Sequence, residues 1–281
     1  MKTISEYKKQ KDFLVCVDSD GCAMDTMDIK HFRCFGPCMV DEWELFEWRK
    51  EILARWNDIN LYTITRGINR FRGLAKALTE INAKYREIEG VAAFAEWAEN
   101  SPELSNSALK KIIEEKPDEA IFAKALSWSI AVNKAITELP GEAKIPFPLA
   151  KEALAYAHTF ADVAIVSSAN LDAVLEEWSA HGLLEHTDIV MSQNDGSKAF
   201  CISELLKKGY EKGKTVMCCD APGDLAAAEK NGVYFYPILV RNEKASWAEF
   251  IAEGGNKLCE GSFGDEYQAA KKNEFLKNLG E

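Results

Sequence analysis

The sequence predicts an α/β fold in which a doubly wound parallel sheet carries an inserted α-helical domain. Short, unbroken apolar runs alternate with amphipathic stretches, and each run ends at a cluster of polar residues. Continuous apolar runs are typical of strands buried on both faces, and alternation with helices favours parallel pairing. Few strand-like runs occur between the first and the second of these apolar runs, which predicts a helical insertion there.

The expected elements alternate as strand, helix, strand and helix from residue 160 onward. The apolar runs expected as strands are Phe13–Val17, Val163–Val166, Ile189–Met191, Thr215–Cys219 and Tyr234–Val240. The helical stretches around them are Leu149–Phe160, Leu171–His181, Ala199–Lys208 and Asp224–Asn231. Ligands of open α/β sheets bind at the carboxyl ends of the strands, so the polar residues that follow each run are the candidates for a functional site.

The insertion after the first strand is rich in helical periodicity. Apolar residues follow a helical stripe in Asp41–Trp56 and again in Glu119–Leu139, so we expect long helices there. A proline-rich stretch then returns the chain to the sheet. We therefore expect an α/β core made of residues 1–24 and 142–281, and a helical domain made of residues 25–141.

Composition and charge narrow the class of protein. The chain has 281 residues, of which 47% are hydrophobic and 28% charged, and its formal net charge is −11. Such a surface repels nucleic acid and anionic lipid, so we expect neither as a partner. No apolar run approaches the roughly 18 residues of a membrane span, and the polar, lysine-rich Met1–Asp12 does not look like a signal peptide. We expect a cytoplasmic protein whose oligomeric state the sequence leaves open.

The eight cysteines are expected to be reduced, because disulfides are rare in that compartment. Cys34 and Cys38 have the spacing of a metal-binding pair, but no second pair with zinc-site spacing accompanies them. Their role stays open.

The first polar cluster comes directly after Phe13–Val17. Asp18 and Asp20 lie two residues apart, and their carboxylates can converge on one metal ion if the chain turns at Ser19, which Gly21 eases. One carboxylate can then attack a substrate while the other transfers a proton. Taken alone, the same residues could form an ordinary polar turn at the end of a strand.

Three further clusters follow the later strands. Ser167 and Ser168 can bind phosphoryl oxygens, and Lys198 can neutralise negative charge. Asp220 offers a carboxylate to Mg²⁺, and Asp224 can cap a helix and support the site from behind. Each group alone could be a helix cap or a surface residue. Their arrival in this order at successive strand ends argues for one shared site.

These residues together resemble the four motifs of the haloacid-dehalogenase-like hydrolase superfamily. In order, the motifs match at Asp18 with Asp20, at Ser167, at Lys198, and at Asp220 with Asp224, and the match covers roughly residues 11–24 and 142–245. The insertion after the first motif corresponds to the helical cap of the family, the C1 type. The resemblance implies a Rossmann-like core, Mg²⁺ and an aspartyl-phosphate intermediate.

The resemblance also implies a role for each matching residue. Asp18 would be the nucleophile and a metal ligand, and Asp20 the general acid and base, binding the metal through its carbonyl oxygen. Asp220 would be a metal ligand and Lys198 would neutralise charge. Ser167, with Ser168 beside it, would bind the phosphoryl group, and Asp224 would support the site from behind the metal ligands.

Three positions depart from the family pattern. Cys22 stands where Thr or Val is usual, Ala199 follows Lys198 where Pro is common, and Cys219 replaces the usual Gly before Asp220. None of these changes removes a chemical group that the reaction needs, so they bear on the subfamily rather than on activity.

The sequence therefore predicts a magnesium-dependent phosphohydrolase that acts on a small phosphorylated metabolite. Asp20 favours phosphate esters, because a halide leaving group needs no proton. The alternatives are a sugar-phosphate mutase of the same superfamily and a catalytically idle relative that serves as a binding or scaffold protein.

Substrate choice is expected to lie in the helical domain. The segment Thr65–Arg72 brings three arginines together beside Gly67, and Arg66 and Arg70 are the candidates for binding an anionic or polyhydroxylated substrate. The alternative is a solvated helix face whose Phe71 points into the core.

Overall fold

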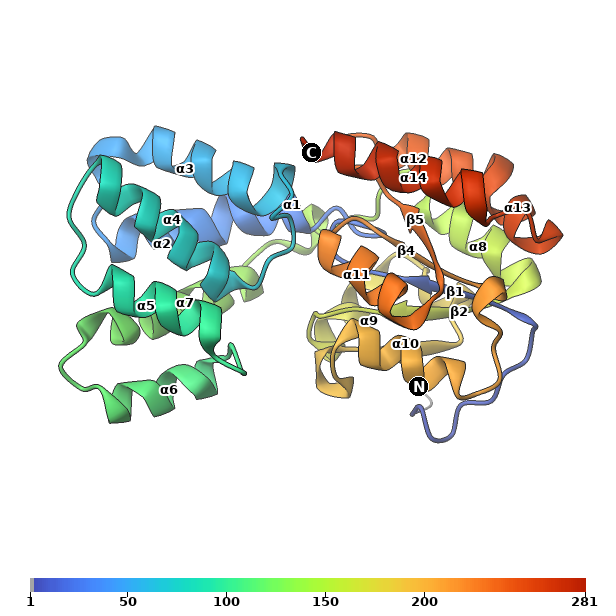
Figure 1. Cartoon of the computed structure of the whole chain (residues 1–281), viewed down its shortest axis with the longest axis horizontal. Helices are drawn as coiled ribbons and strands as arrows, with labels where there is room; N and C mark the ends of the chain where they lie inside the picture. The colour runs from blue at the N-terminus through green and yellow to red at the C-terminus, as the bar shows by residue number, and fades with distance from the viewer. Residues whose placement is uncertain (1–2) are drawn as a thin grey trace. The chain divides into compact units, whose positions relative to one another are not determined.

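The structure is a computed structural model that describes residues 3–281, and its sheet has the predicted α/β architecture. Five parallel strands lie in the order β3-β2-β1-β4-β5, with helices on both sides (Figure 1). The strands are β1 (Phe13–Val17), β2 (Ala161–Val166), β3 (Ile189–Met191), β4 (Thr215–Cys219) and β5 (Tyr234–Pro237). The predicted fold class is confirmed.

The strand boundaries follow the apolar runs closely. Strands β2, β3 and β4 are buried along their whole length, as continuous hydrophobic runs require of a sheet covered on both faces. Strand β2 begins two residues before the predicted Val163, and β5 ends at Pro237 rather than at Val240.

Helices connect the strands in the order expected of a doubly wound sheet. Those of the sheet region are α8 (Ala150–Phe160), α9 (Leu171–Ala180), α10 (Lys198–Leu206), α11 (Pro222–Asn231), α12 (Glu243–Glu249), α13 (Gly255–Glu260) and α14 (Asp265–Asn278). The four helices predicted between the strands are found within two residues of their expected bounds. None of the helices within residues 3–281 combines the length and the apolar character that a membrane span requires.

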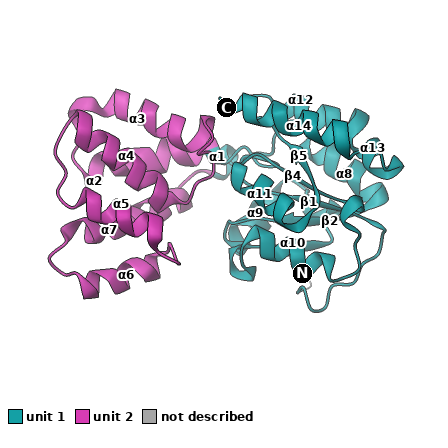
Figure 2. Cartoon of the chain, in the orientation of Figure 1, with its two compact units in different colours: residues 1–27, 141–281 teal, residues 28–140 magenta. Residues whose placement is uncertain are grey.

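The chain divides into two compact units, coloured separately in Figure 2. Unit 1 consists of residues 1–27 and 141–281 and contains the sheet, whereas unit 2 consists of residues 28–140. Two isolated β-bridges lie within unit 1, one between Asp20 and Met24 and one between Met24 and Pro146. The segment that follows β1 therefore pairs with the segment that returns from unit 2.

Unit 2 is helical. Its helices are α2 (Gly36–Glu42), α3 (Arg49–Asn57), α4 (Arg70–Lys84), α5 (Val91–Asn100), α6 (Asn106–Glu115) and α7 (Ala120–Thr137), preceded by the short α1 (Met27–Lys30) at the boundary. Aromatic side chains dominate the core of unit 2, where Trp56, Phe71 and Trp128 are almost completely buried. The rings of Trp56 and Trp128 meet edge to face at 6.0 Å.

The prediction of one helix over Asp41–Trp56 is wrong. Helix α2 ends at Glu42, and α3 begins only at Arg49. Glu44 has a φ of 52°, in the left-handed region, and this turn lets the Leu45 N–H bond back to the Val40 carbonyl at 2.9 Å. This turn buries Leu45 completely. The apolar spacing that predicted a helix therefore arises from a helix, a turn and a second helix, which all direct apolar side chains into the core.

Replacing Trp128 by Ala is expected to lower the free energy of unfolding by about 3–5 kcal/mol, because a fully buried ring is deleted and the Phe35 carbonyl loses an indole donor at 3.1 Å. Urea unfolding followed by circular dichroism measures the change. Ile130→Ala on the same helix is the control, since Ile130 is 53% exposed and should cost less than about 0.5 kcal/mol. Equal losses in the two variants would contradict the packing described here.

Candidate active site

The predicted site residues of unit 1 lie at the carboxyl edge of the sheet. The central strand β1 has Val17 opposite Ile165 of β2 and Cys218 of β4, so the residues that follow these strands emerge side by side. Asp18 continues this pattern, with its N–H donating to the Cys218 carbonyl at 3.1 Å. Sheet register alone therefore brings the first, second and fourth motifs together.

A tight turn follows Asp18 and is bonded from several sides. Gly21 has a φ of 82°, which a residue with a side chain rarely adopts, and the Ser19 N–H donates to Asp18 Oδ1 at 2.7 Å. Two fully buried tryptophans donate to the same turn: Trp178 Nε1 to Ser19 Oγ at 2.8 Å and Trp247 Nε1 to the Cys22 carbonyl at 3.1 Å. The turn that carries Asp18 is consequently fixed by the core of unit 1.

Charged groups concentrate at the end of β1. Lys198, the first residue of α10, places Nζ 2.6 Å from Asp18 Oδ2 and 2.5 Å from Asp224 Oδ1. One oxygen from each of Asp18, Asp220 and Asp224 lies within 4.8 Å of the others, and all three residues are buried. We call Asp18, Lys198, Asp220 and Asp224 the charge cluster. It holds three carboxylates and one ammonium.

Burial and mutual repulsion change the proton affinities of this cluster. Burial raises the pKa of Asp18 from 3.8 to about 7; Lys198 opposes this rise, while Asp224 and Asp220 add to it. Burial by itself lowers the pKa of Lys198, but Asp18 and Asp224 outweigh it and raise the pKa well above the usual value. Lys198 is therefore the fixed positive charge of the cluster.

The cluster fits a divalent cation that prefers oxygen ligands. Within residues 3–281, Asp224 Oδ2 is buried and has no hydrogen-bond partner, although a buried carboxylate oxygen is normally bonded. Carboxylates in such a set are typical ligands of Mg²⁺, which binds one or two of them together with water and substrate oxygens. A cation here would offset the mutual repulsion of the three carboxylates.

The other predicted site residues of unit 1, Asp20, Ser167 and Ser168, lie outside the charge cluster. Asp20 accepts a hydrogen bond at Oδ1 from the hydroxyl of the fully buried Thr26, and its carboxylate is not among the three that converge. Ser167 is buried after β2, and its Oγ accepts from the Ala169 N–H at 3.2 Å. Ser168 is exposed.

Asp224 and Thr26 extend the site beyond what the sequence suggested. We expect from the sequence that Asp224 acts from behind the other carboxylates, and the structure places it in direct contact with Lys198, with an oxygen within 4.8 Å of oxygens of Asp18 and Asp220. The sequence predicts that Asp224 lies in the first turn of a helix, now α11, but it does not predict which way the side chain points. Thr26 had no signal, because its bond to Asp20 depends on how the chain folds back after the turn.

Two of the three departures from the family pattern, Cys22 and Cys219, lie in the interior of unit 1. Cys22 and Cys219 are fully buried, and Cys22 Sγ donates to the Cys218 carbonyl at 3.2 Å. Burial raises the pKa values of the Cys22 and Cys219 thiols well above the usual value, with the neighbouring carboxylates adding to the rise. Both thiols are therefore neutral packing groups beside the charge cluster.

In unit 2, the two candidate arginines differ in their surroundings. Arg66 lies in the loop before α4, is 2% exposed, and donates through Nη1 to the Leu61 carbonyl at 2.7 Å. Arg70 is the first residue of α4 and donates through Nη1 to Asn133 Oδ1 at 2.7 Å. Phe71 is buried in the core, as the alternative interpretation of this segment expected.

Neither Cys34 nor Cys38 belongs to a group of three metal-binding side chains in the part of the chain that the structure describes. Cys34 is buried and Cys38 is partly exposed, and both are free thiols. Burial raises the pKa of each thiol.

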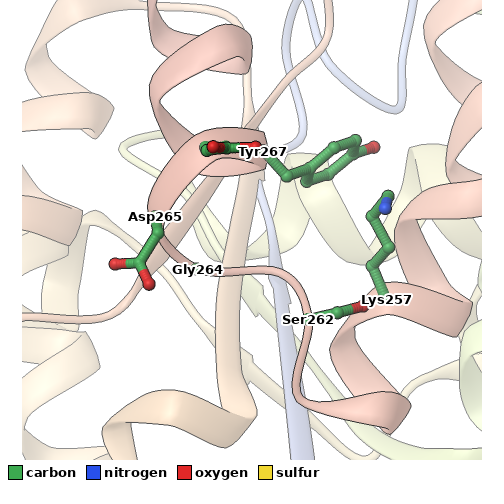
Figure 3. A pocket seen from close by; sticks show the side chains of 6 residues that line it. Lys257, Ser262, Gly264, Asp265 and Tyr267 are labelled. Atoms are coloured by element: carbon green, nitrogen blue, oxygen red, sulfur yellow. The ribbon is translucent and has the colours of Figure 1, made fainter.

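A separate surface depression of about 530 Å³ lies in unit 1 beside α13 and α14 (Figure 3). None of the predicted site residues lines it. Lys257 and Tyr267 point toward each other across it, with the ammonium 5.0 Å from the ring centre, and Glu253 pairs with the same ammonium at 3.4 Å. The ammonium of Lys257 in this depression therefore already has partners within the protein.

No protein-family model matches the chain, and no curated protein matches it. Solved structures similar to it include a haloacid dehalogenase-like hydrolase from Streptococcus pneumoniae, at 11% identity over 85% of this chain and 90% of that one, with a TM-score of 0.45. A candidate phosphoglycolate phosphatase from Lactobacillus delbrueckii subsp. bulgaricus is 16% identical over 80% and 85% of the two chains, with a TM-score of 0.47.

A candidate β-phosphoglucomutase from Bacteroides vulgatus is 13% identical over 95% of this chain and 93% of that one, with a TM-score of 0.46. All three are similarities of fold.

Asp18→Asn is expected to stabilise the metal-free protein at alkaline pH. Because the pKa of Asp18 is raised to about 7, the stability that its neutral form provides is complete below about pH 4 and is lost as the pH rises through 7. Asn is neutral at every pH. The melting temperature of Asp18→Asn in EDTA should therefore exceed that of the wild type increasingly from pH 5 to pH 8.

At pH 8 the free energy of unfolding of Asp18→Asn should exceed that of the wild type by at most about 4 kcal/mol, at 1.36 kcal/mol per pKa unit. Mg²⁺ should reduce this difference. Asp12→Asn is the control, since the Asp12 side chain is 74% exposed, and its melting temperature should follow the wild type at each pH. A difference between Asp18→Asn and the wild type that does not change with pH would contradict the raised pKa.

Proposed function

We propose that this chain is a Mg²⁺-dependent phosphohydrolase that acts on a small phosphorylated metabolite through an aspartyl-phosphate on Asp18. The observation that carries the proposal is the charge cluster at the end of the central strand, where a buried carboxylate, a buried ammonium and two further carboxylates meet. A structural ion pair needs one carboxylate for one ammonium, and this cluster holds two more carboxylates than that. The excess suits a site that binds a cation.

In the first step, the Asp18 carboxylate would attack phosphorus and displace the alcohol of the ester. The attacking group must be ionised, and Lys198 at 2.6 Å favours the ionised form. Asp20 would donate a proton to the departing oxygen, as an alkoxide requires. The hydrogen bond from Thr26 holds the Asp20 carboxylate in place.

In the second step, water would attack the acyl-phosphate and Asp20 would accept the water's proton. Phosphate leaves and the Asp18 carboxylate is restored. Mg²⁺, held by Asp18, Asp220 and the Asp20 carbonyl with Asp224 nearby, would stabilise the charge of the transferring group. Ser167 and Ser168 would bind its oxygens, so that positioning and electrostatics supply most of the acceleration.

The helical unit 2 is the proposed determinant of substrate choice, with Arg66 and Arg70 as candidates. The cytoplasm is the proposed location.

Asp18→Asn is expected to reduce the release of phosphate from p-nitrophenyl phosphate in Mg²⁺ by on the order of a thousandfold or more, because an amide cannot accept the phosphoryl group. The assay is the colour of released p-nitrophenolate with purified protein. Asp12→Asn should retain full activity, and EDTA should abolish activity in both the wild type and the control.

Wild-type protein that shows no turnover, and no trapping of beryllium fluoride, on any phosphate ester would favour the idle scaffold over the enzyme. Conversion of a sugar 1-phosphate to its 6-phosphate without release of phosphate would favour the mutase. Full turnover by Asp18→Asn would exclude the aspartyl-phosphate mechanism.

Asp20→Asn is expected to separate the two steps. With an alkyl phosphate, the first step should slow by about 10²–10⁴-fold, because the alkoxide departs without a proton. With p-nitrophenyl phosphate, whose phenolate leaves readily, the first step should proceed and the aspartyl-phosphate should accumulate. Intact-protein mass spectrometry detects the added phosphoryl group, and Asp18→Asn, which cannot form it, is the control. An equal slowing of the first step with both esters would contradict the role of Asp20 as general acid.

A further inference from the structure

Arg70 of unit 2 carries a charge that the protein leaves without a counter-charge. Among residues 3–281, no carboxylate forms an ion pair with Arg70, and burial alone lowers the pKa of its guanidinium. Other cations that are comparably enclosed are paired: Lys198 with Asp18 and Lys271 with Glu249. In a chain of net charge −11, carboxylates are abundant, so a partly buried guanidinium without an ion pair is unexpected.

The contacts of Arg70 use only one side of its guanidinium. Nη1 donates to Asn133 Oδ1 at 2.7 Å and to Ser129 Oγ at 3.1 Å, with the Ser129 carbonyl at 3.5 Å. The Ser129 hydroxyl gives its own proton to Asn106 Oδ1 at 2.7 Å, which leaves its oxygen as an acceptor for Arg70. All these partners are neutral, so they orient the guanidinium without neutralising it.

The other edge of the guanidinium, Nε and Nη2, has no hydrogen bond within the described chain. The face of the group lies on the Phe35 ring, 5.0 Å from its centre, and His31 stacks on the same ring at 4.6 Å. A guanidinium fixed on one edge and one face, with the second edge open, presents two parallel N–H donors. Asn133, beside it on α7, is exposed, so solvent reaches this position.

We propose that Arg70, oriented by Ser129, Asn133 and Phe35, is a binding site for a carboxylate or phosphate group. A planar or tetrahedral oxyanion would accept two hydrogen bonds from Nε and Nη2 and would supply the missing counter-charge. The group belongs either to a free oxyanion or to a substrate that has an anionic group besides its phosphate ester. The site stands on contacts within unit 2 and does not depend on the proposed reaction.

The neighbouring Arg72 shows what a structural arginine looks like in the same helix. Its Nε donates to the Ala98 carbonyl at 3.1 Å and its Nη2 to the Glu99 carbonyl at 3.2 Å, which satisfies the carbonyl end of α5. Arg72 therefore serves as a matched control. It is two residues away on α4 and has the same charge, but its Nε and Nη2, the edge that is open in Arg70, donate to backbone oxygens.

The test measures the binding of sulfate by thermal unfolding of the full chain at constant ionic strength, for the wild type, Arg70→Met and Arg72→Met. Arg70→Met should weaken sulfate binding at least tenfold, and Arg72→Met should leave it unchanged even though the protein is less stable. Arg70→Lys should retain the charge but lose the fork, with an intermediate loss. The phosphoryl-binding residues of unit 1 are the same in all variants, so their contribution cancels.

Equal sulfate affinity in the wild type and Arg70→Met, or an equal loss in Arg72→Met, would overturn the proposal. Kinetics on the same proteins distinguish a second anionic group of the substrate from a free oxyanion. If the anion belongs to the substrate, Arg70→Met should raise KM for esters with a second anionic group at least tenfold more than it raises KM for p-nitrophenyl phosphate. If it is a free oxyanion, sulfate should change KM for both classes equally in the wild type, and this change should be smaller, and again equal for both classes, in Arg70→Met.

Discussion

The burial of Lys198 between Asp18 and Asp224 is the constraint on which the architecture of unit 1 depends. Each of these charges is expensive to remove from water, and the ion pairs are stable only while both partners stay in place. The sheet provides that rigidity, since β1 and β4 fix the ends from which Asp18 and Asp220 emerge. Because three buried carboxylates lie within 4.8 Å of one another, the same arrangement that costs stability suits the cation that we propose.

The sheet and the order of its polar residues could be predicted from the sequence because the physics there is local. A strand buried on both faces must be apolar throughout, and parallel strands place their carboxyl ends at one edge, so the runs ending at Val17, Val166 and Cys219 located the candidate site. Asp224 was underestimated because the direction of a side chain in the first turn of a helix depends on how that helix packs.

The helical unit was harder to predict, since one hydrophobic stripe is compatible with more than one backbone. Residues 41–56 have the spacing of a single helix, yet Glu44 adopts a left-handed conformation and Leu45 reaches the core from a turn. The arginines near α4 were equally ambiguous. Arg72 binds backbone carbonyls and Arg70 does not, a distinction that depends on residues of α5 and α7 far away in the sequence.

The two tryptophans bonded to the turn after Asp18 have a practical consequence. The fluorescence emission of an indole depends on the hydrogen bond of its N–H and on the electric field around the ring. Trp178 and Trp247 are fully buried, and their N–H groups donate to the turn that follows Asp18. The protein thus contains its own optical probe of that turn. Changes of charge beside Ser19 and Cys22 can be followed in the native chain by fluorescence, without attaching a dye.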